Sequence, residues 1–148
     1  MKTPTLKLSD VTHKWHLIDL DGQILGRAAV QIATLLTGKG KVLSGDHLDN
    51  GDFVVAINAD KFKVTGNKLT DKIYYSHSGF PGGFKEVSLQ QLKDRDVRKV
   101  IEKAVKGMLP KDKNQQTRMR RLKVYSDAKH PYAVELGLVK KEEKKAEK

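Results

Sequence analysis

The sequence contains no cysteine, which excludes a disulfide framework, a thiol nucleophile and any cysteine-ligated zinc site. No uncharged run approaches the ~20 residues that a membrane-spanning helix needs. The start of the chain, MKTPTLKLSDVTHKW, lacks the apolar stretch of a secretory signal peptide. These absences fit a reducing compartment, and we expect a cytoplasmic protein with no membrane partner.

Acidic side chains are scarce relative to basic ones, with 18 against 29, and the formal net charge is +11. Residues 1–97 carry 13 basic and 11 acidic side chains, a net of +2, whereas residues 98–148 carry 16 and 7, a net of +9. Net charge bears on association rather than on fold. The imbalance therefore favours a polyanionic partner over a merely solubilising surface.

The 148 residues, 38% of them hydrophobic, are sufficient for one domain with a packed core. We expect a polar lead-in over 1–13, a folded body over 14–134 that binds the polyanion and a charged, disordered tail over 135–148.

Hydrophobic periodicity predicts strands alternating with helices, and hence an α/β layered domain with a largely parallel sheet. Strands are expected at 15–19, 52–58, 72–75 and 122–125, with turns at 21–22 and 66–67. An apolar stripe predicts a helix over 25–36 that ends at Gly38. A capping box at 88–91 starts a second helix, which breaks near 94–96 and restarts before ending at Pro110.

Two nucleotide-binding motifs are absent. The stretch YYSHSGFPGGFK at 74–85 has glycines beside a lysine, but Phe84 stands where a Walker loop has its second glycine. In the strand–turn–helix at 19–33, Gly22 and Gly26 are four apart, unlike a dinucleotide fingerprint. A nucleotide-dependent enzyme is thus the least favoured class. Arg27, at the expected helix start, could still contact an RNA phosphate.

The histidines do not suggest a catalytic or metal site. His13 and His16 lie three apart in an irregular lead-in without a third ligand. Asp46, Asp49 and Asp52 surround His47, but aspartates beside a strand usually serve turns. We expect no catalytic residue, no metal and no cofactor.

Aromatic and basic residues together favour RNA binding, because aromatic faces stack on bases while cations hold phosphates. Between 74 and 84 the aromatic candidates are Tyr74, Tyr75, His77, Phe80 and Phe84. Strand alternation predicts that one of the two tyrosines points inward, and Phe84 could do so as well. The neighbouring glycines would let backbone amides approach a phosphate.

The densest basic cluster lies between 111 and 123, with no acid after Asp112. If this segment is helical, Arg118 and Arg121 share one face while Met119 and Leu122 dock inward. The cations would repel each other unless a polyanion neutralised them.

Several motifs occur in a family order: GD at 51–52, VTGNKLTDK at 64–72, YYSHSGFPGG at 74–83, IEKAVKGMLP at 101–110, LKVY at 122–125 and HP at 130–131. Together they resemble the bacterial large-subunit ribosomal protein L13 family from about residue 15 to 131. The resemblance implies a three-layer α/β/α domain around a mostly parallel sheet, with a basic C-terminal extension. It also implies a monomer within the ribosome, binding to large-subunit ribosomal RNA beside neighbouring ribosomal proteins, a place early in subunit assembly, and no enzymatic activity.

Two segments depart from that family pattern. The family usually has Tyr-x-Pro-His where this chain has Ser44-Gly45-Asp46-His47, and the added acid puts RNA contact there in doubt. The family tends to have Gly-Arg where this chain has Gln115-Gln116, so one cation is lost and a different local shape is expected.

The leading hypothesis is a structural component of the large ribosomal subunit, and the alternative is a translational regulator that binds messenger RNA off the ribosome. From the charge pattern, the aromatic stretch and the resemblance together, the predicted RNA-binding residues are Arg27, Lys39, Lys41, Asn67, Lys68, Lys72, His77, Ser78, Gly79, Phe80, Pro81, Gly82, Gly83, Lys85, Lys106, Lys111, Lys113, Arg118, Arg120, Arg121, Lys123 and His130.

Overall fold

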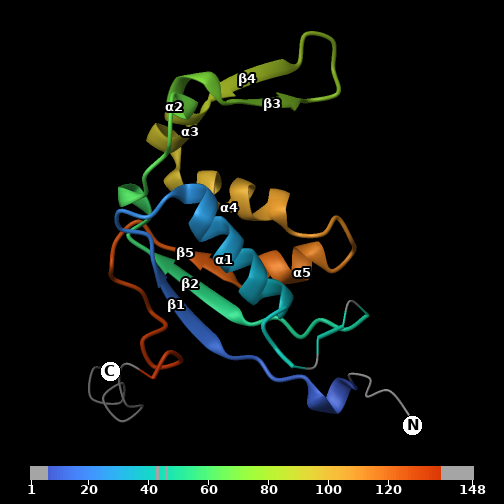
Figure 1. Cartoon of the computed structure of the whole chain (residues 1–148). Helices are drawn as coiled ribbons and strands as arrows, with labels where there is room; N and C mark the ends of the chain where they lie inside the picture. The colour runs from blue at the N-terminus through green and yellow to red at the C-terminus, as the bar shows by residue number, and fades with distance from the viewer. Residues whose placement is uncertain (1–6, 43, 46, 138–148) are drawn as a thin grey trace, which may run out of the picture.

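A computed structural model describes residues 7–42, 44–45 and 47–137, and it shows an α/β body from which a β-hairpin projects (Figure 1). The expected tail falls largely on 138–148, outside the described residues. The elements in chain order are η1 (Leu8–Asp10), β1 (Trp15–Asp19), α1 (Leu25–Thr37), β2 (Phe53–Ile57), η2 (Ala59–Lys61), α2 (Lys68–Asp71), β3 (Ile73–His77), β4 (Phe84–Ser88), α3 (Leu89–Arg95), α4 (Val97–Met108), α5 (Gln115–Arg120) and β5 (Leu122–Val124).

The sheet of the body is parallel, as predicted, with the strand order β1-β2-β5. Trp15 pairs with Phe53 at one end of the β1–β2 ladder, and Val54 pairs with Leu122 in the β2–β5 ladder. The central strand β2 is buried on both faces, which explains why its sequence is a continuous apolar run rather than an alternating one. Val54 and Ala56 face the main core, which also contains Leu122 and Val124.

Helices α1 and α4 form the layer that covers one face of this sheet (Figure 1). The apolar stripe of α1 is buried, and the helix ends at Gly38, whose left-handed φ of 77° suits a glycine. The predicted capping box of α3 is present: Ser88 Oγ accepts from the Gln91 amide and Gln91 Oε1 accepts from the Ser88 amide. The predicted break falls at Asp96, which caps α4.

The opposite face of the sheet carries aromatic side chains. Trp15 stacks on Phe53 with ring centroids 4.4 Å apart, and on Tyr132 at 5.0 Å. Tyr132 lies in a run of turns over 131–137, so this layer is irregular in the described part of the chain. The contact joins segments from both ends of the body.

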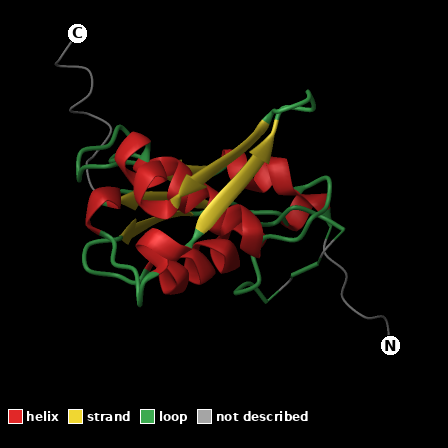
Figure 2. Cartoon of the chain, turned by 90° about the horizontal axis from the view of Figure 1, so that it is seen from above, coloured by secondary structure: helices red, strands yellow, loops and turns green. Residues whose placement is uncertain are grey.

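The hairpin β3–β4 is a separate antiparallel pair, in which Ile73 pairs with Ser88 and His77 with Phe84. Strand β3 was predicted, but β4 (Phe84–Ser88) was not. Seen from above, the connecting loop extends beyond the helices (Figure 2). The hairpin therefore presents a surface that the body does not cover.

Candidate nucleic-acid interface

The two faces of the hairpin differ in burial. Tyr74 and Val87, a directly opposed pair, pack against the core, so the predicted inward tyrosine is Tyr74. On the other face Tyr75 is 61% exposed and Phe84 is 56% exposed, so the suggestion that Phe84 points inward is wrong. The rings of Tyr75 and Phe84 stack with centroids 5.6 Å apart. Strand alternation thus gives the hairpin an aromatic, solvent-facing side.

The loop between the two strands is held together by hydrogen bonds among its own residues. The amide of Gly79 donates to His77 Nδ1 at 2.9 Å, that of Gly83 to the Phe80 carbonyl at 2.9 Å, and that of Ser78 to the Gly83 carbonyl at 3.2 Å. The amides of Gly79 and Gly83 are therefore already hydrogen bonded within the loop, contrary to the idea that these two glycines offer them to a phosphate. Both bonds stabilise the turn.

That turn exposes Phe80, 74% of whose surface is accessible to solvent. Ser78, Pro81 and Lys85 are exposed on the same hairpin end, and Gly82 takes a left-handed φ of 72°. A Cβ on Gly83 would lie 2.9 Å from the Phe80 carbonyl oxygen, a backbone atom, so the tightness of the turn favours glycine at 83. The loop is consequently a compact projection with an aromatic tip.

At the base of the hairpin, three lysines surround a cavity between α1, α2 and α4. Lys68, Lys72 and Lys103 line it together with Gly26 and Met108. The ammonium groups of Lys72 and Lys103 lie 5.6 Å and 4.8 Å from the centre of the Tyr74 ring. Burial raises the pKa of the Tyr74 hydroxyl, so that hydroxyl stays neutral beside the two cations. The site combines positive charge with a partly apolar floor.

A basic surface continues along α4 to α5, and we call it the α4–α5 basic face. Its members are the lysines and the arginine that line two adjoining cavities between these helices: Lys99, Lys103, Lys106, Lys111 and Arg120. Lys103 also lines the cavity at the hairpin base, so the three cavities follow one another along α4. The sequence prediction included Lys106, Lys111 and Arg120 but missed Lys99 and Lys103, although the spacing 99, 103, 106 marks one helical face.

Gln115 links the start of α5 to the end of α4 by hydrogen bonds. Its side-chain amide donates to the carbonyls of Lys106 at 3.0 Å and Leu109 at 3.3 Å. Carbonyls at a helix C-terminus lack intrahelical partners, so these bonds stabilise the end of α4. The departure from the family pattern at 115–116 thus has a local structural effect. In the other departure, Asp46 lies outside the described residues.

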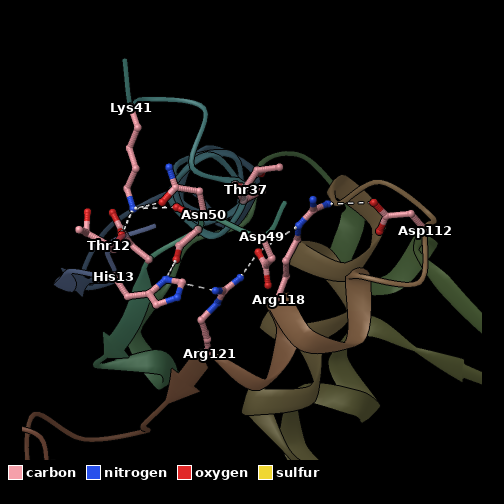
Figure 3. A network of polar contacts seen from close by, with 12 residues as sticks. Thr12, His13, Thr37, Lys41, Asp49, Asn50, Asp112, Arg118 and Arg121 are labelled. Atoms are coloured by element: carbon pink, nitrogen blue, oxygen red, sulfur yellow. Dashed lines mark hydrogen bonds and ion pairs between the residues drawn. The ribbon is translucent and has the colours of Figure 1, made fainter. Parts of the chain in front are cut away.

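Two predicted RNA-binding arginines point inward instead of outward. Arg118 is 1% exposed and Arg121 is 7% exposed. Both guanidinium groups converge on Asp49: Arg121 Nη2 donates to Asp49 Oδ1, and Arg118 Nε lies 3.7 Å from the same oxygen (Figure 3). Asp112 Oδ2 accepts from Arg118 Nη1 at 3.3 Å. Arg118 and Arg121 share one face, and Met119 and Leu122 pack in the core, as expected. The expectation that the two arginines face a polyanion is wrong, because their face points inward and internal carboxylates neutralise both cations.

Lys41 is likewise engaged inside the protein. Its Nζ lies 2.6 Å from Asp52 Oδ1 and donates to the Asn50 carbonyl at 2.7 Å and to the Thr12 carbonyl. Burial raises the pKa of Asp52, but bonds from the Lys14 amide, Lys41 and His16 outweigh it and hold that pKa below its ordinary value. The buried carboxylate is therefore an ionised partner for Lys41.

His13 completes the contacts around the same turn. Its Nδ1 donates to the Gly51 carbonyl, so Arg121 Nη1, 3.4 Å from that nitrogen, contacts the ring without a shared hydrogen bond (Figure 3). Within residues 7–42, 44–45 and 47–137, no group of three histidine or acidic side chains could hold a metal ion. Across the same residues, no helix is both long and apolar enough to cross a membrane.

The remaining predicted residues are dispersed over the molecule. Arg27, near the start of α1, and Lys39, just after its end, are both exposed, and about 15 Å of helix separates Arg27 from Thr37, the last residue of α1. Asn67 is exposed before α2, and Lys113 is exposed before α5. Two more are half-buried: Lys123 in β5, and His130 against Tyr125, with ring centroids 6.3 Å apart.

Comparison with known proteins gives a consistent result. Residues 13–131 match a family model described as ribosomal protein L13. A large ribosomal subunit protein uL13 from Syntrophotalea carbinolica is 47% identical over 138 residues, which cover 93% of this chain and 97% of the relative. The uL13 proteins of Psychrobacter cryohalolentis and Pseudomonas putida are each 50% identical, over 89% and 91% of this chain and 93% and 95% of their own lengths.

Proposed function

Because the chain belongs to the ribosomal protein L13 family, whose matched relatives are proteins of the large ribosomal subunit, we propose that it binds large-subunit ribosomal RNA. The binding surface runs from the aromatic side of the hairpin, past Lys68 and Lys72 at its base, to the α4–α5 basic face. By holding RNA segments on one rigid body, the protein supports early assembly of the subunit beside neighbouring ribosomal proteins.

The observation that carries this proposal is a set of lysines whose charge no carboxylate neutralises within residues 7–42, 44–45 and 47–137. In the described part of the chain, Lys68, Lys72, Lys103, Lys106 and Lys111 form no ion pair with a carboxylate. Lysines lined up along successive cavities repel one another in the free protein. Phosphates relieve that repulsion and release counterions from the RNA, which favours binding.

The hairpin supplies a second kind of contact. Tyr75, Phe80 and Phe84 expose aromatic surface on an extension that reaches away from the body. Unpaired bases stack on such rings, and each stacked base is worth about 1–3 kcal/mol. The combination suits folded RNA, which offers both phosphates and unstacked bases in loops.

The test is the salt dependence of binding to purified large-subunit ribosomal RNA. Replacing Lys103 and Lys106 with Met should weaken binding and reduce the slope of log K against log salt by about 0.7–0.9 per lost phosphate contact. The matched control is Lys61→Met, since Lys61 is an exposed lysine paired with Asp21 at 3.6 Å, outside this surface. Equal slope changes in the two variants would contradict the proposed surface.

A sucrose gradient tests the cellular role. We expect the protein to sediment with large subunits and their precursors, and a pool that stayed at the top of the gradient would oppose a ribosomal role. Binding to a messenger leader that survived competition by ribosomal RNA would instead support the regulatory alternative. No observation on the described structure favours that alternative.

A further inference from the structure

We propose that Asp49 is a positioning residue for the RNA-binding surface. Its carboxylate holds Arg118 and Arg121 inside the protein, and this internal anchor fixes α5 so that Arg120 and the lysines beside it face outward. The inference rests on the proposed function, but it assigns Arg118 and Arg121 a structural task instead of a contact with phosphate. We call Asp49, Arg118, Arg121 and Asp112 the Asp49 cluster.

The turn that carries Asp49 is held firmly in place. The next residue but one, Gly51, lies against the C-terminal end of α1 so closely that a Cβ there would be 1.8 Å from the Leu36 carbonyl oxygen. The Asp52 amide donates to the Leu35 carbonyl at 3.0 Å, and Lys41 donates to Asn50 on the other side. The turn between α1 and β2 therefore holds Asp49 in a fixed position.

Helix α5, in contrast, has little to hold it by itself. It spans six residues, Gln115–Arg120, and helices this short are unstable without tertiary contacts. Arg118 and Arg121 are three positions apart, so both side chains leave the helix on its inner side and reach the same carboxylate oxygen. Arg120, between them, is exposed and lines the basic cavity with Lys99 and Lys106.

Because the guanidinium groups of Arg118 and Arg121 are buried, their stability inside the protein depends on the Asp49 carboxylate. Arg118 has one other carboxylate, the half-exposed Asp112, whereas Asp49 is the carboxylate paired with Arg121 in the described part of the chain. A buried cation that loses its partner is strongly unfavourable, while an apolar replacement of the whole cluster is often tolerated. If Asp49 lost its charge, the two arginines would reach water most readily by detachment of α5 from the body.

These properties define two informative variants and one control. Asp49→Asn removes the charge with little change of shape. The triple variant Asp49→Leu, Arg118→Met and Arg121→Met removes the anchor and the buried cations together. Arg120→Met, in the same helix, removes an outward cation and leaves the anchor intact. Each full-length protein is measured by limited trypsin digestion without RNA, and by binding to large-subunit ribosomal RNA across a salt series.

We expect trypsin to cut after Lys111 and Lys113, sites that every variant keeps, at least about tenfold faster in Asp49→Asn than in the unmodified protein, because cleavage follows the population of the opened segment. Its RNA affinity should fall as well. The triple variant should regain slow cleavage and near-normal affinity, with an unchanged salt slope. Arg120→Met should digest normally while its slope falls by about 0.7–0.9.

Two results would overturn the inference. Normal digestion and normal RNA affinity of Asp49→Asn would show that α5 does not depend on the anchor. A triple variant that resists trypsin but loses about 1.4–1.8 from the slope would show that the two arginines contact phosphates themselves. Failure of the unmodified protein to bind the RNA would instead refute the proposed function and the positioning role with it, whereas digestion would still report on the anchor alone.

Discussion

Gly51 offers the sharpest test of the packing, because a single methyl group there has no room. An alanine Cβ would lie 1.8 Å from the Leu36 carbonyl oxygen and 2.5 Å from the Leu36 carbonyl carbon, both of them backbone atoms. Real Cβ contacts stay beyond 3.0 Å, so the turn would have to move by more than 1 Å. A flexible side chain could yield to such a clash, but the end of α1 cannot.

The cost of that movement follows from what the turn holds. Displacing it strains the bond from His13 to the Gly51 carbonyl and the bond from the Asp52 amide to Leu35, each worth about 1 kcal/mol. It also shifts Asp49 away from Arg121, and a broken buried ion pair costs about 3–5 kcal/mol. We therefore expect Gly51→Ala to reduce the free energy of unfolding by about 3–5 kcal/mol, and the melting temperature by about 10 °C.

The matched control is Gly107→Ala in α4. Nothing lies within 4 Å of a Cβ at that position. Alanine is the better helix former, so the control should gain about 0.5–1 kcal/mol. Urea titration at 25 °C and thermal unfolding, both followed by far-ultraviolet circular dichroism, compare the two variants. A Gly51→Ala protein within 1 kcal/mol of the unmodified chain would refute the close approach.

Three further expectations concern stability. Val100→Asp should prevent folding, since Val100 is fully buried and the new charge would have no partner; a cooperative urea transition would contradict this. Because the pKa of Asp52 is lowered in the folded protein, its contribution is present above its ordinary pKa of 3.8 and lost as pH falls through the folded value. Stability should thus fall on acidification below about pH 4, and less steeply in Asp52→Asn, as measured by urea titrations from pH 6 to pH 3. Ser88→Ala, which breaks the capping box of α3, should cost about 1 kcal/mol in the same assay, whereas an unchanged midpoint would show that the cap contributes nothing.

The parts of the fold that the sequence predicted well are those set by local pattern. The run at 52–58 had to be a strand covered on both faces, and the stripe over 25–36 with Gly38 after it had to be a helix with a glycine cap. Ser88 and Gln91 fixed the start of α3 for the same reason, since both partners of the capping box lie within one turn. Strand β4 was missed because the glycines at 82–83 were interpreted as an approach surface for a phosphate rather than as part of a hairpin turn.

The parts that could not be predicted depend on partners distant in the chain. Arg121 and Asp49 are 72 positions apart, so nothing near Arg121 in the sequence indicates that its charge is neutralised. Charge density alone made the segment over 111–123 look uniformly available to a polyanion. The spacing of Lys99, Lys103 and Lys106, by contrast, was visible as a helical face and could have extended the predicted interface along α4.

The strand order β1-β2-β5 has a consequence for the time at which the protein becomes complete during its synthesis. Strand β2 pairs with β5, which lies near the end of the body, and the contact of Arg121 with Asp49 spans 72 positions. At about 5–20 residues per second, the ribosome needs roughly 4–14 s to make that stretch. During this interval one edge of β2 and the carboxylate of Asp49 lack their final partners. Strand β5, the last strand to be synthesised in the described part of the chain, completes the three-stranded sheet. A nascent chain that stopped before residue 122 would therefore carry much of the basic surface while its sheet still lacked β5.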